Sequence, residues 1–227
     1  AGCYRVTFGI ESGNKEVRKF IQKKVPLDQA QRMVRHANKI GMWTVCTFIL
    51  GFPYETKETM RDSIKFAVDC GTDMAVFYLL MPHPTSDVYA TFKKEGLLDL
   101  DPIIDPSTYK SDEDFAAIGE VLSQRGAQTK YCSPQDLQEM LNEAYRTFFR
   151  ARLKSWILHP MQIFRKIRNF EDLCYTIQVA NGLAKPIRNF ISSKKTHINM
   201  LWDKYNEKDG FAKPKIHEVK TTAKTGC

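Results

Sequence analysis

The sequence has little that would mark a membrane-spanning, disulfide-rich or metal-binding protein. No apolar run approaches the roughly 20 residues needed to cross a bilayer, so we expect no transmembrane segment. The six cysteines are widely spaced and include no C-x-x-C pair, which excludes a local iron–sulfur loop or zinc knuckle built from them. In a chain of this size we expect reduced thiols rather than disulfides, and therefore a cytoplasmic protein without metal ligands of its own.

The composition is that of a folded protein with an uneven positive charge. Hydrophobic residues make up 43% of the 227 residues, which is enough for a core and for one or two domains. The net charge is +8, and residues 146–169 carry seven basic side chains and no acidic one. Such a field could attract phosphates, nucleic acid or an anionic membrane surface. It could equally be a solvated helix face, which is the interpretation that we favour.

Hydrophobic periodicity predicts alternating strands and helices in the first 96 residues. β-branched and aromatic runs indicate strands, and apolar residues at helical spacing indicate helices between them. The expected strands span 4–10, 43–50 and 74–80, and the expected helices span 15–22, 27–40, 58–70 and 87–95. The connections are long enough for right-handed parallel crossovers. Because parallel sheets are normally buried on both faces, we expect an α/β protein in which residues 1–96 form a β-α-β-α-β part of a larger structure.

The remainder of the chain is predicted to be mainly helical. Residues 97–132 are expected to form an irregular linker that contains several Asp and Pro residues. Ser133 and Pro134 are favourable at the start of a helix, and Pro160 is expected to end or kink that helix near His159. A helical extension is therefore expected over 133–205, with helices near 160–168, 171–182 and 186–204, and a flexible tail over 206–227.

Two short motifs stand where predicted strands end. Gly9-Ile10-Glu11-Ser12-Gly13 follows the first strand, and Gly51-Phe52-Pro53-Tyr54-Glu55-Thr56 follows the second. In parallel α/β structures, ligands bind at the carboxyl ends of the strands. The Glu11 carboxylate can accept hydrogen bonds from hydroxyl or ammonium groups, and the Ser12 hydroxyl can donate or accept one. The motifs therefore predict a ligand site at this edge of the sheet.

Together, at this spacing, the two motifs resemble the second half of a radical S-adenosylmethionine (radical SAM) catalytic domain. Family members commonly read G-I-E-S-G at one strand end and G-x-P-x-E-T after the next strand. The resemblance covers residues 1–96 and implies the C-terminal half of a partial (β/α)6 barrel, followed by an all-helical extension. The family also needs a C-x-x-x-C-x-x-C loop for a [4Fe-4S] cluster, which this sequence lacks. We therefore expect a fragment of a longer enzyme, inactive alone, with the cluster ligands outside this chain.

The resemblance implies which residues would bind S-adenosylmethionine (SAM). Glu11 and Ser12 would hold its ribose or methionyl group, although Glu11 could instead cap the next helix. Lys23 would meet the SAM carboxylate or a strand-end acid, or be an ordinary surface lysine. The residues expected near the adenine are Ile49, Gly51, Tyr78, Leu80 and Met81. Glu55 and Thr56 are expected to be architectural, because they stand where they can satisfy free backbone amides at a helix start.

Two departures from the family pattern affect the loops after the second and third strands. Tyr54 replaces the glycine that usually follows the proline of G-x-P-x-E-T, which puts a bulky ring near the cleft. Pro82-His83-Pro84-Thr85-Ser86 stands where family members often show P-x-P-G-T, again without the glycine. His83 is a candidate acid/base group or substrate contact, and a polar surface residue is the alternative.

Residues 133–152 resemble the helical tail of cobalamin-binding radical SAM proteins, with Phe149 in place of the usual tyrosine. The leading hypothesis is therefore a radical SAM enzyme that uses SAM and a [4Fe-4S] cluster, of the cobalamin-dependent type, for methyl transfer or rearrangement. The cobalamin domain would lie outside this chain. Expected partners are a small-molecule or lipid-like substrate and an electron donor such as flavodoxin or ferredoxin.

Two other hypotheses remain open. One is a methylthiotransferase-like or tRNA-modifying radical SAM enzyme, whose basic helices would contact RNA. The other is a non-catalytic α/β binding module with a basic helical arm, which predicts no affinity for SAM.

Overall fold

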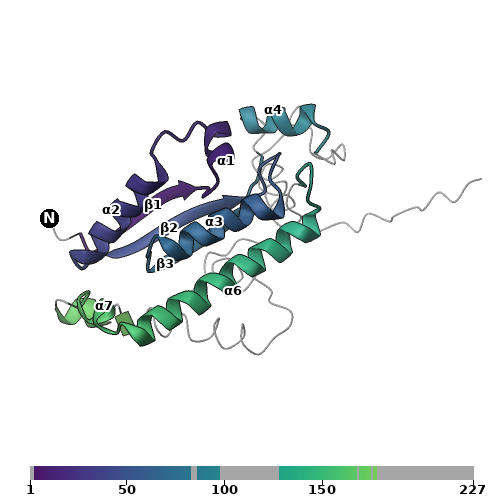
Figure 1. The fold of residues 1–227 in the computed structure, drawn as a ribbon. Coiled ribbons are helices and arrows are strands. Elements are labelled where there is room, and N and C mark those ends of the chain that lie inside the picture. The colour runs from purple at the N-terminus through teal and green to yellow at the C-terminus, as the bar shows by residue number, and fades with distance from the viewer. Residues whose placement is uncertain (1–2, 83–85, 98–127, 168, 175, 178–227) are drawn as a thin grey trace, which may run out of the picture. The chain divides into compact units, whose positions relative to one another are not determined.

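A sheet of three parallel strands forms the centre of the protein (Figure 1). The computed structural model describes residues 3–82, 86–97, 128–167, 169–174 and 176–177. The strands are β1 (Arg5–Glu11), β2 (Trp43–Leu50) and β3 (Met74–Leu79), and they lie in the order β1-β2-β3. The predicted α/β class and β-α-β-α-β order are confirmed, and each strand boundary lies within one residue of its expected position.

Helices connect the strands and begin at identifiable caps. They are α1 (Lys15–Phe20), α2 (Leu27–Lys39), α3 (Lys57–Asp69) and α4 (Asp87–Lys94). Asn14 caps α1 as expected, since its Oδ1 accepts from the backbone N–H groups of Glu16 and Val17 at 3.0 and 3.1 Å. Thr56 caps α3 in a reciprocal capping box with Thr59. These caps fix where each helix leaves the carboxyl end of its strand.

The two faces of the sheet differ sharply in burial. On β2, the alternate residues Thr44, Cys46, Phe48 and Leu50 are fully buried, whereas Val45, Thr47 and Ile49 are only partly buried. The buried face is covered by helices, because the Phe48 ring contacts Phe66 of α3 and stacks on Phe77 of β3. We call the opposite face, which includes Val45, Thr47 and Ile49, the uncovered face. Within the described part of the chain, this face has no second covering layer of the kind that parallel sheets usually have.

A long helix, α6 (Pro134–Leu158), packs against α3 and β3. It begins at the predicted position with a Ser133–Asp136 capping box, and it ends at the residue before His159, next to Pro160. The Tyr145 hydroxyl donates to the Phe77 carbonyl oxygen and accepts from its backbone N–H, both at 3.2 Å. Tyr145 thereby satisfies backbone groups of β3 that would otherwise form an open sheet edge.

A short helix, α7 (Met161–Phe164), follows α6, and residues 170–174 and 176–177 are also helical. In the part of the chain that the structure describes, no helix is long and apolar enough to cross a membrane. The expected helix over 186–204, the tail over 206–227 and most of the linker over 97–132 lie outside the described residues. The expected domain boundaries therefore stay predictions.

Candidate functional site

Glu11 ends β1 in a backbone conformation that is unusual for any residue except glycine. Its φ angle is +67°, in the left-handed region where an L side chain is strained by about 1–3 kcal/mol. The Ser12 backbone N–H donates to the Ile10 carbonyl oxygen at 2.9 Å, which makes a tight turn around Glu11. The pairing of β1 with β2 also shifts register between Gly9 and Glu11. Strain of this kind is retained where surrounding contacts impose it, often at functional sites.

Arg18 of α1 supplies those contacts. Its side chain is buried, and its guanidinium donates to the carbonyl oxygens of Ile10 at 2.7 Å and Ser12 at 3.2 Å, on either side of Glu11. It also donates to the Val25 carbonyl oxygen. Burial lowers the pKa of Arg18, and the nearby Glu11 carboxylate opposes that shift. This role of Arg18 was not predicted, because an arginine on a charged helix carries no local signal that it turns inward.

The Glu11 carboxylate folds back over Gly9 on the uncovered face. A Cβ atom at Gly9 would lie only 2.6 Å from Glu11 Oε1, so only glycine leaves room for this position. Lys23 Nζ lies 3.5 Å from the same oxygen, and both side chains remain partly exposed, at 33% for Lys23 and 26% for Glu11. The structure thus brings together two of the predicted site residues as an accessible carboxylate–ammonium pair.

Ser12 and Gly13 attach the turn to α3. Ser12 is fully buried, and its Oγ lies 3.2 Å from Ser63 Oγ and accepts from the Asn14 N–H at 3.1 Å. The Gly13 N–H donates to Ser63 Oγ at 2.8 Å, and a Cβ atom at Gly13 would lie 2.5 Å from the Asp62 carbonyl oxygen. The structure therefore engages Ser12 in the protein interior, and its predicted contact with a ligand stays a prediction.

Of the predicted site residues around β2 and β3, Ile49 and Tyr78 lie on the uncovered face, and the others lie in the loops that follow these strands. Ile49 and Tyr78 are register partners on neighbouring strands, and Tyr78 is 48% exposed. Leu80 and Met81 are partly buried, and Leu80 packs against a small cluster with Phe92 of α4. His83 lies outside the described residues. Thr47, which pairs with Gly9 on the uncovered face, was missed, although the period-two alternation along β2 is a signal that could have identified it.

Gly51 belongs to a turn that a buried carboxylate holds in place. Glu55 Oε2 accepts from the backbone N–H groups of Gly51 at 2.7 Å and Phe52 at 3.0 Å. Gly51 has a φ of +94°, and a Cβ atom added there would lie 3.3 Å from Leu137 Cδ1 of α6. Burial raises the pKa of Glu55 to about 7, although the two amides favour its charged form. Glu55 thus stabilises the loop after β2, in agreement with the architectural role expected for it.

The described residues do not supply a metal site. They contain no group of three or more His, Cys, Asp or Glu side chains that could hold an ion. Cys46, Cys70 and Cys132 are buried and free, and Cys3 and Cys174 are free as well. The described residues therefore do not fit a [4Fe-4S] cluster.

The chain is similar to known proteins over the region that contains this site. Residues 1–67 match the radical SAM superfamily. The chain is 31% identical to an uncharacterized methyltransferase of Pyrococcus horikoshii over 65% of its length, and 31% identical to the cytidylyl-2-hydroxyethylphosphonate methyltransferase of Streptomyces wedmorensis over 48%. It is 30% identical to the anaerobic magnesium-protoporphyrin IX monomethyl ester cyclase of Rubrivivax gelatinosus over 39%.

Among solved structures, the chain resembles the coproporphyrinogen III oxidase of Escherichia coli, described as a radical SAM enzyme. The TM-score is 0.43 at 19% identity, over 66% of this chain and 27% of that one. The chain spans 29%, 22% and 16% of the lengths of the three sequence relatives, in the order given above. The region that matches the radical SAM superfamily, residues 1–67, contains the Glu11 turn, Lys23 and the Gly51 loop.

Proposed function

We propose that the carboxyl edge of this sheet binds SAM within a radical SAM enzyme. The observation that carries the proposal is the strained Glu11 turn, which holds a carboxylate over Gly9 beside Lys23 on the uncovered face. A partly exposed carboxylate can accept hydrogen bonds from ribose hydroxyls or from the SAM ammonium group. Lys23 can pair with the carboxylate of the methionyl group.

The neighbouring strands offer apolar surface for the adenine. Ile49 and Tyr78 lie side by side in register on the uncovered face, where an aromatic and a branched side chain can contact a flat base. Arg18, Ser12 and Glu55 have positioning roles, because they hold the two loops that border this surface. Leu80, Met81 and Gly51 would then shape the site through the backbone after β2 and β3.

The described residues hold no cluster, and their part is to bind and orient SAM. When bound at a reduced [4Fe-4S] cluster, SAM supplies the radical chemistry of this family, so the cluster and an electron donor such as flavodoxin or ferredoxin would come from outside these residues. Two of the three relatives above are named as methyltransferases, which supports methyl transfer on a small-molecule or lipid-like substrate. The resemblance of residues 133–152 to cobalamin-binding relatives supports the cobalamin-dependent type.

The proposal is tested by measuring SAM binding to the full chain by ligand-observed NMR, which detects weak complexes. Glu11→Gln removes the charge but keeps the shape, and it should weaken SAM binding about tenfold, since hydrogen bonds to a charged group contribute roughly 1.5–3 kcal/mol. Lys23→Met should weaken it to a smaller degree, because Lys23 is more exposed.

Glu16→Gln is the matched control, because Glu16 is an exposed acid on α1, next to the same turn. It should leave SAM binding unchanged. Equal SAM affinity in wild type and Glu11→Gln would refute the assignment of Glu11. Absence of any SAM binding would favour the non-catalytic binding module instead.

A further inference from the structure

A second candidate site lies at the opposite end of the sheet from the Glu11 turn. A cavity of about 410 Å³ opens where the C-terminal half of α2, the start of β3, the end of α6 and the residues around α7 meet. Its polar lining includes Asn38, Ser155 and Gln162, and its charged lining consists of Arg35, Lys39, Asp73, Arg152, Arg165 and Lys166. Five of these six charged side chains are basic, so the cavity has a surplus of positive charge.

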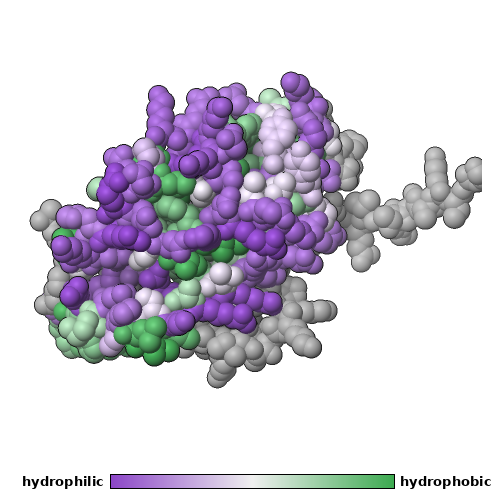
Figure 2. Space-filling model, viewed as in Figure 1, coloured by the Kyte–Doolittle hydropathy of each residue, from purple (hydrophilic) through white to green (hydrophobic). Residues whose placement is uncertain are grey.

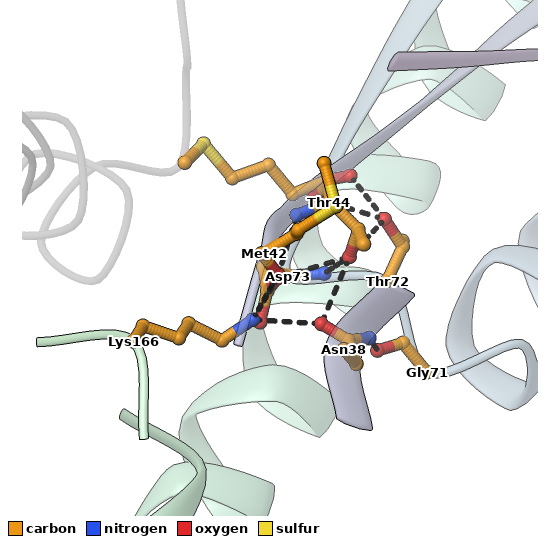
Figure 3. A network of polar contacts seen from close by, with 8 residues as sticks. Asn38, Met42, Thr44, Gly71, Thr72, Asp73 and Lys166 are labelled. Atoms are coloured by element: carbon orange, nitrogen blue, oxygen red, sulfur yellow. Dashed lines mark hydrogen bonds and ion pairs between the residues drawn. The ribbon is translucent and has the colours of Figure 1, made fainter. Parts of the chain in front are cut away.

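The one acid in the lining, Asp73, already has a cation. Lys166 Nζ lies 2.6 Å from Asp73 Oδ2 and also donates to Asn38 Oδ1 at 2.7 Å and to the Met42 carbonyl oxygen at 2.8 Å (Figure 3). The same Asp73 oxygen accepts from the Thr44 backbone N–H and hydroxyl group at 2.8 and 2.9 Å. Asp73 is thus paired with Lys166, and although its carboxylate also favours the charged form of Arg152, it is a single acid facing five basic side chains of the cavity.

Four cations of the cavity lining make no ion pair with an acid of the described residues. Among the described residues, no ion pair involves Arg35, Lys39, Arg152 or Arg165. The closest acid of α3, Asp69, pairs through its carboxylate with Lys65 and offers Arg35 only its backbone oxygen, at 3.1 Å. Like charges gathered in one partly enclosed space repel one another, and an anion would relieve that repulsion.

Among the cations without an ion pair, Arg152 would gain most from a bound anion, because it is buried. Only 7% of its surface is exposed, its guanidinium carbon lies 5.5 Å from the Phe148 ring centroid, and its Nε has no hydrogen-bond partner. Burying an uncompensated charge and an unmade hydrogen bond is costly. The planar guanidinium offers donors in a fork that matches the oxygens of a phosphate. Sequence analysis favoured a solvated face for residues 146–169, but Arg152 and Lys166 of that stretch are buried.

We propose that this cavity is a binding site for a phosphate group, separate from the SAM edge, in which the buried Arg152 and the exposed Arg165 both bind the phosphate. Arg165 is exposed, so it can reach an anion that enters from solvent. Arg35 and Lys39 of α2 add positive charge on the other wall. The binding is purely electrostatic and hydrogen-bonded, and no bond of the phosphate is broken.

The phosphate could be carried by a soluble molecule or by a lipid headgroup. Next to the cavity, four large apolar side chains of α6 and α7 are 60–70% exposed: Ile157, Leu158, Met161 and Phe164. Figure 2 shows hydrophobic residues gathered over this end of the molecule. Exposed apolar side chains beside basic ones are typical of surfaces that lie in a membrane interface. Both sources share the phosphate chemistry, so the experiment distinguishes them.

The test has two arms, both at constant ionic strength because salt screens such contacts. In the first, inorganic phosphate is titrated into the full chain by calorimetry. In the second, the chain is co-sedimented with vesicles of phosphatidylcholine containing phosphatidylglycerol, and with vesicles of phosphatidylcholine alone. Arg152→Gln and Arg165→Gln should each weaken binding about tenfold. Arg150→Gln, which removes an exposed charge from α6 outside the cavity lining, is the matched control and should have no effect.

Each outcome decides the proposal. Loss of phosphate binding in Arg165→Gln but not in Arg150→Gln supports the site with a soluble phosphate as its ligand. The same pattern seen only with the phosphatidylglycerol-containing vesicles, and not with inorganic phosphate, supports the site with a lipid headgroup as its ligand. If Arg152→Gln fails to fold, Arg165→Gln still tests the proposal, because its side chain is exposed. No binding in either arm, or an equal loss in Arg150→Gln, would overturn it.

Discussion

Two buried carboxylates at opposite ends of the sheet are held in opposite ways. At the amino end, Asp73 is 4% exposed and accepts hydrogen bonds from Thr44 and from a buried lysine, Lys166. At the carboxyl end, Glu55 is fully buried, receives only two backbone amides, and keeps Oε1 without a partner. The Asp73 charge is therefore balanced by the Lys166 cation, whereas Glu55 has no cation and burial raises its pKa to about 7.

The difference separates an end where the buried carboxylate is ion-paired from an end that carries backbone strain. Asp73 and Lys166 join residues 93 positions apart, so their pair fastens the segment after α6 to the start of the sheet. At the carboxyl end, by contrast, Glu11 adopts a left-handed backbone and keeps its carboxylate partly exposed beside Lys23. Strained and accessible polar groups are costly to maintain, which is the pattern expected where a ligand binds.

The largest expected effect comes from breaking the amino-end pair. Lys166→Met leaves the Asp73 carboxylate buried without its cation and should lower the free energy of unfolding by about 3–5 kcal/mol. Denaturant titration of wild type and variant measures this change. The double variant Asp73→Asn with Lys166→Met should recover part of the loss, because no unpaired charge remains. A loss below about 1 kcal/mol in the single variant would show that the pair is not a main support of the fold.

The second-largest expected effect is a pH dependence of stability caused by Glu55 at the carboxyl end of the sheet. The pKa of Glu55 is about 7 in the folded protein against an ordinary value of 4.5, so the folded state retains a proton that the unfolded state releases. This contribution is fully present below pH 4.5, is lost as pH rises to about 7, and changes little above that. A shift from 4.5 to about 7 corresponds to about 3 kcal/mol.

Glu55→Gln isolates this contribution, because the amide keeps an oxygen acceptor for Gly51 and Phe52 but does not titrate in this range. The difference in unfolding free energy between wild type and Glu55→Gln should fall between pH 4.5 and about pH 7. Glu16→Gln, at an exposed position, should show no such slope. A difference that is constant across this range would mean that Glu55 is ionised throughout.

The smallest effects come from a pair of glycines in the same turn. A Cβ at Gly13 would meet backbone atoms of α3, with the Asp62 oxygen at 2.5 Å, so Gly13→Ala should destabilise the protein by about 1–3 kcal/mol. A Cβ at Gly9 would meet the flexible end of Glu11 at 2.6 Å. Gly9→Ala should therefore change stability by less than about 1 kcal/mol, but displace the Glu11 carboxylate and weaken SAM binding. Equal destabilisation by both substitutions would contradict this distinction.

Sequence patterns predicted the local structure well and the contacts between distant segments less well. The strands, the cap at Asn14 and the capped start of α6 at Ser133 follow from periodicity and from side chains that act on their own backbone. The inward turn of Arg18 and the burial of Ser12 were not predicted. Both depend on which side of a helix or turn meets a neighbouring element, and a single sequence does not state this.

By itself, the sequence determined the α/β order, the placement of the two glycine-containing motifs at strand ends, and the similarity of residues 1–67 to the radical SAM superfamily. Only the tertiary structure decided that the Glu11 carboxylate lies over Gly9 beside Lys23, and that Lys166 reaches Asp73 at the amino end of the sheet. The reason is physical. Periodicity and capping act over a few residues, whereas burial, ion pairing and pKa shifts depend on groups that approach one another only after the helices pack onto the sheet.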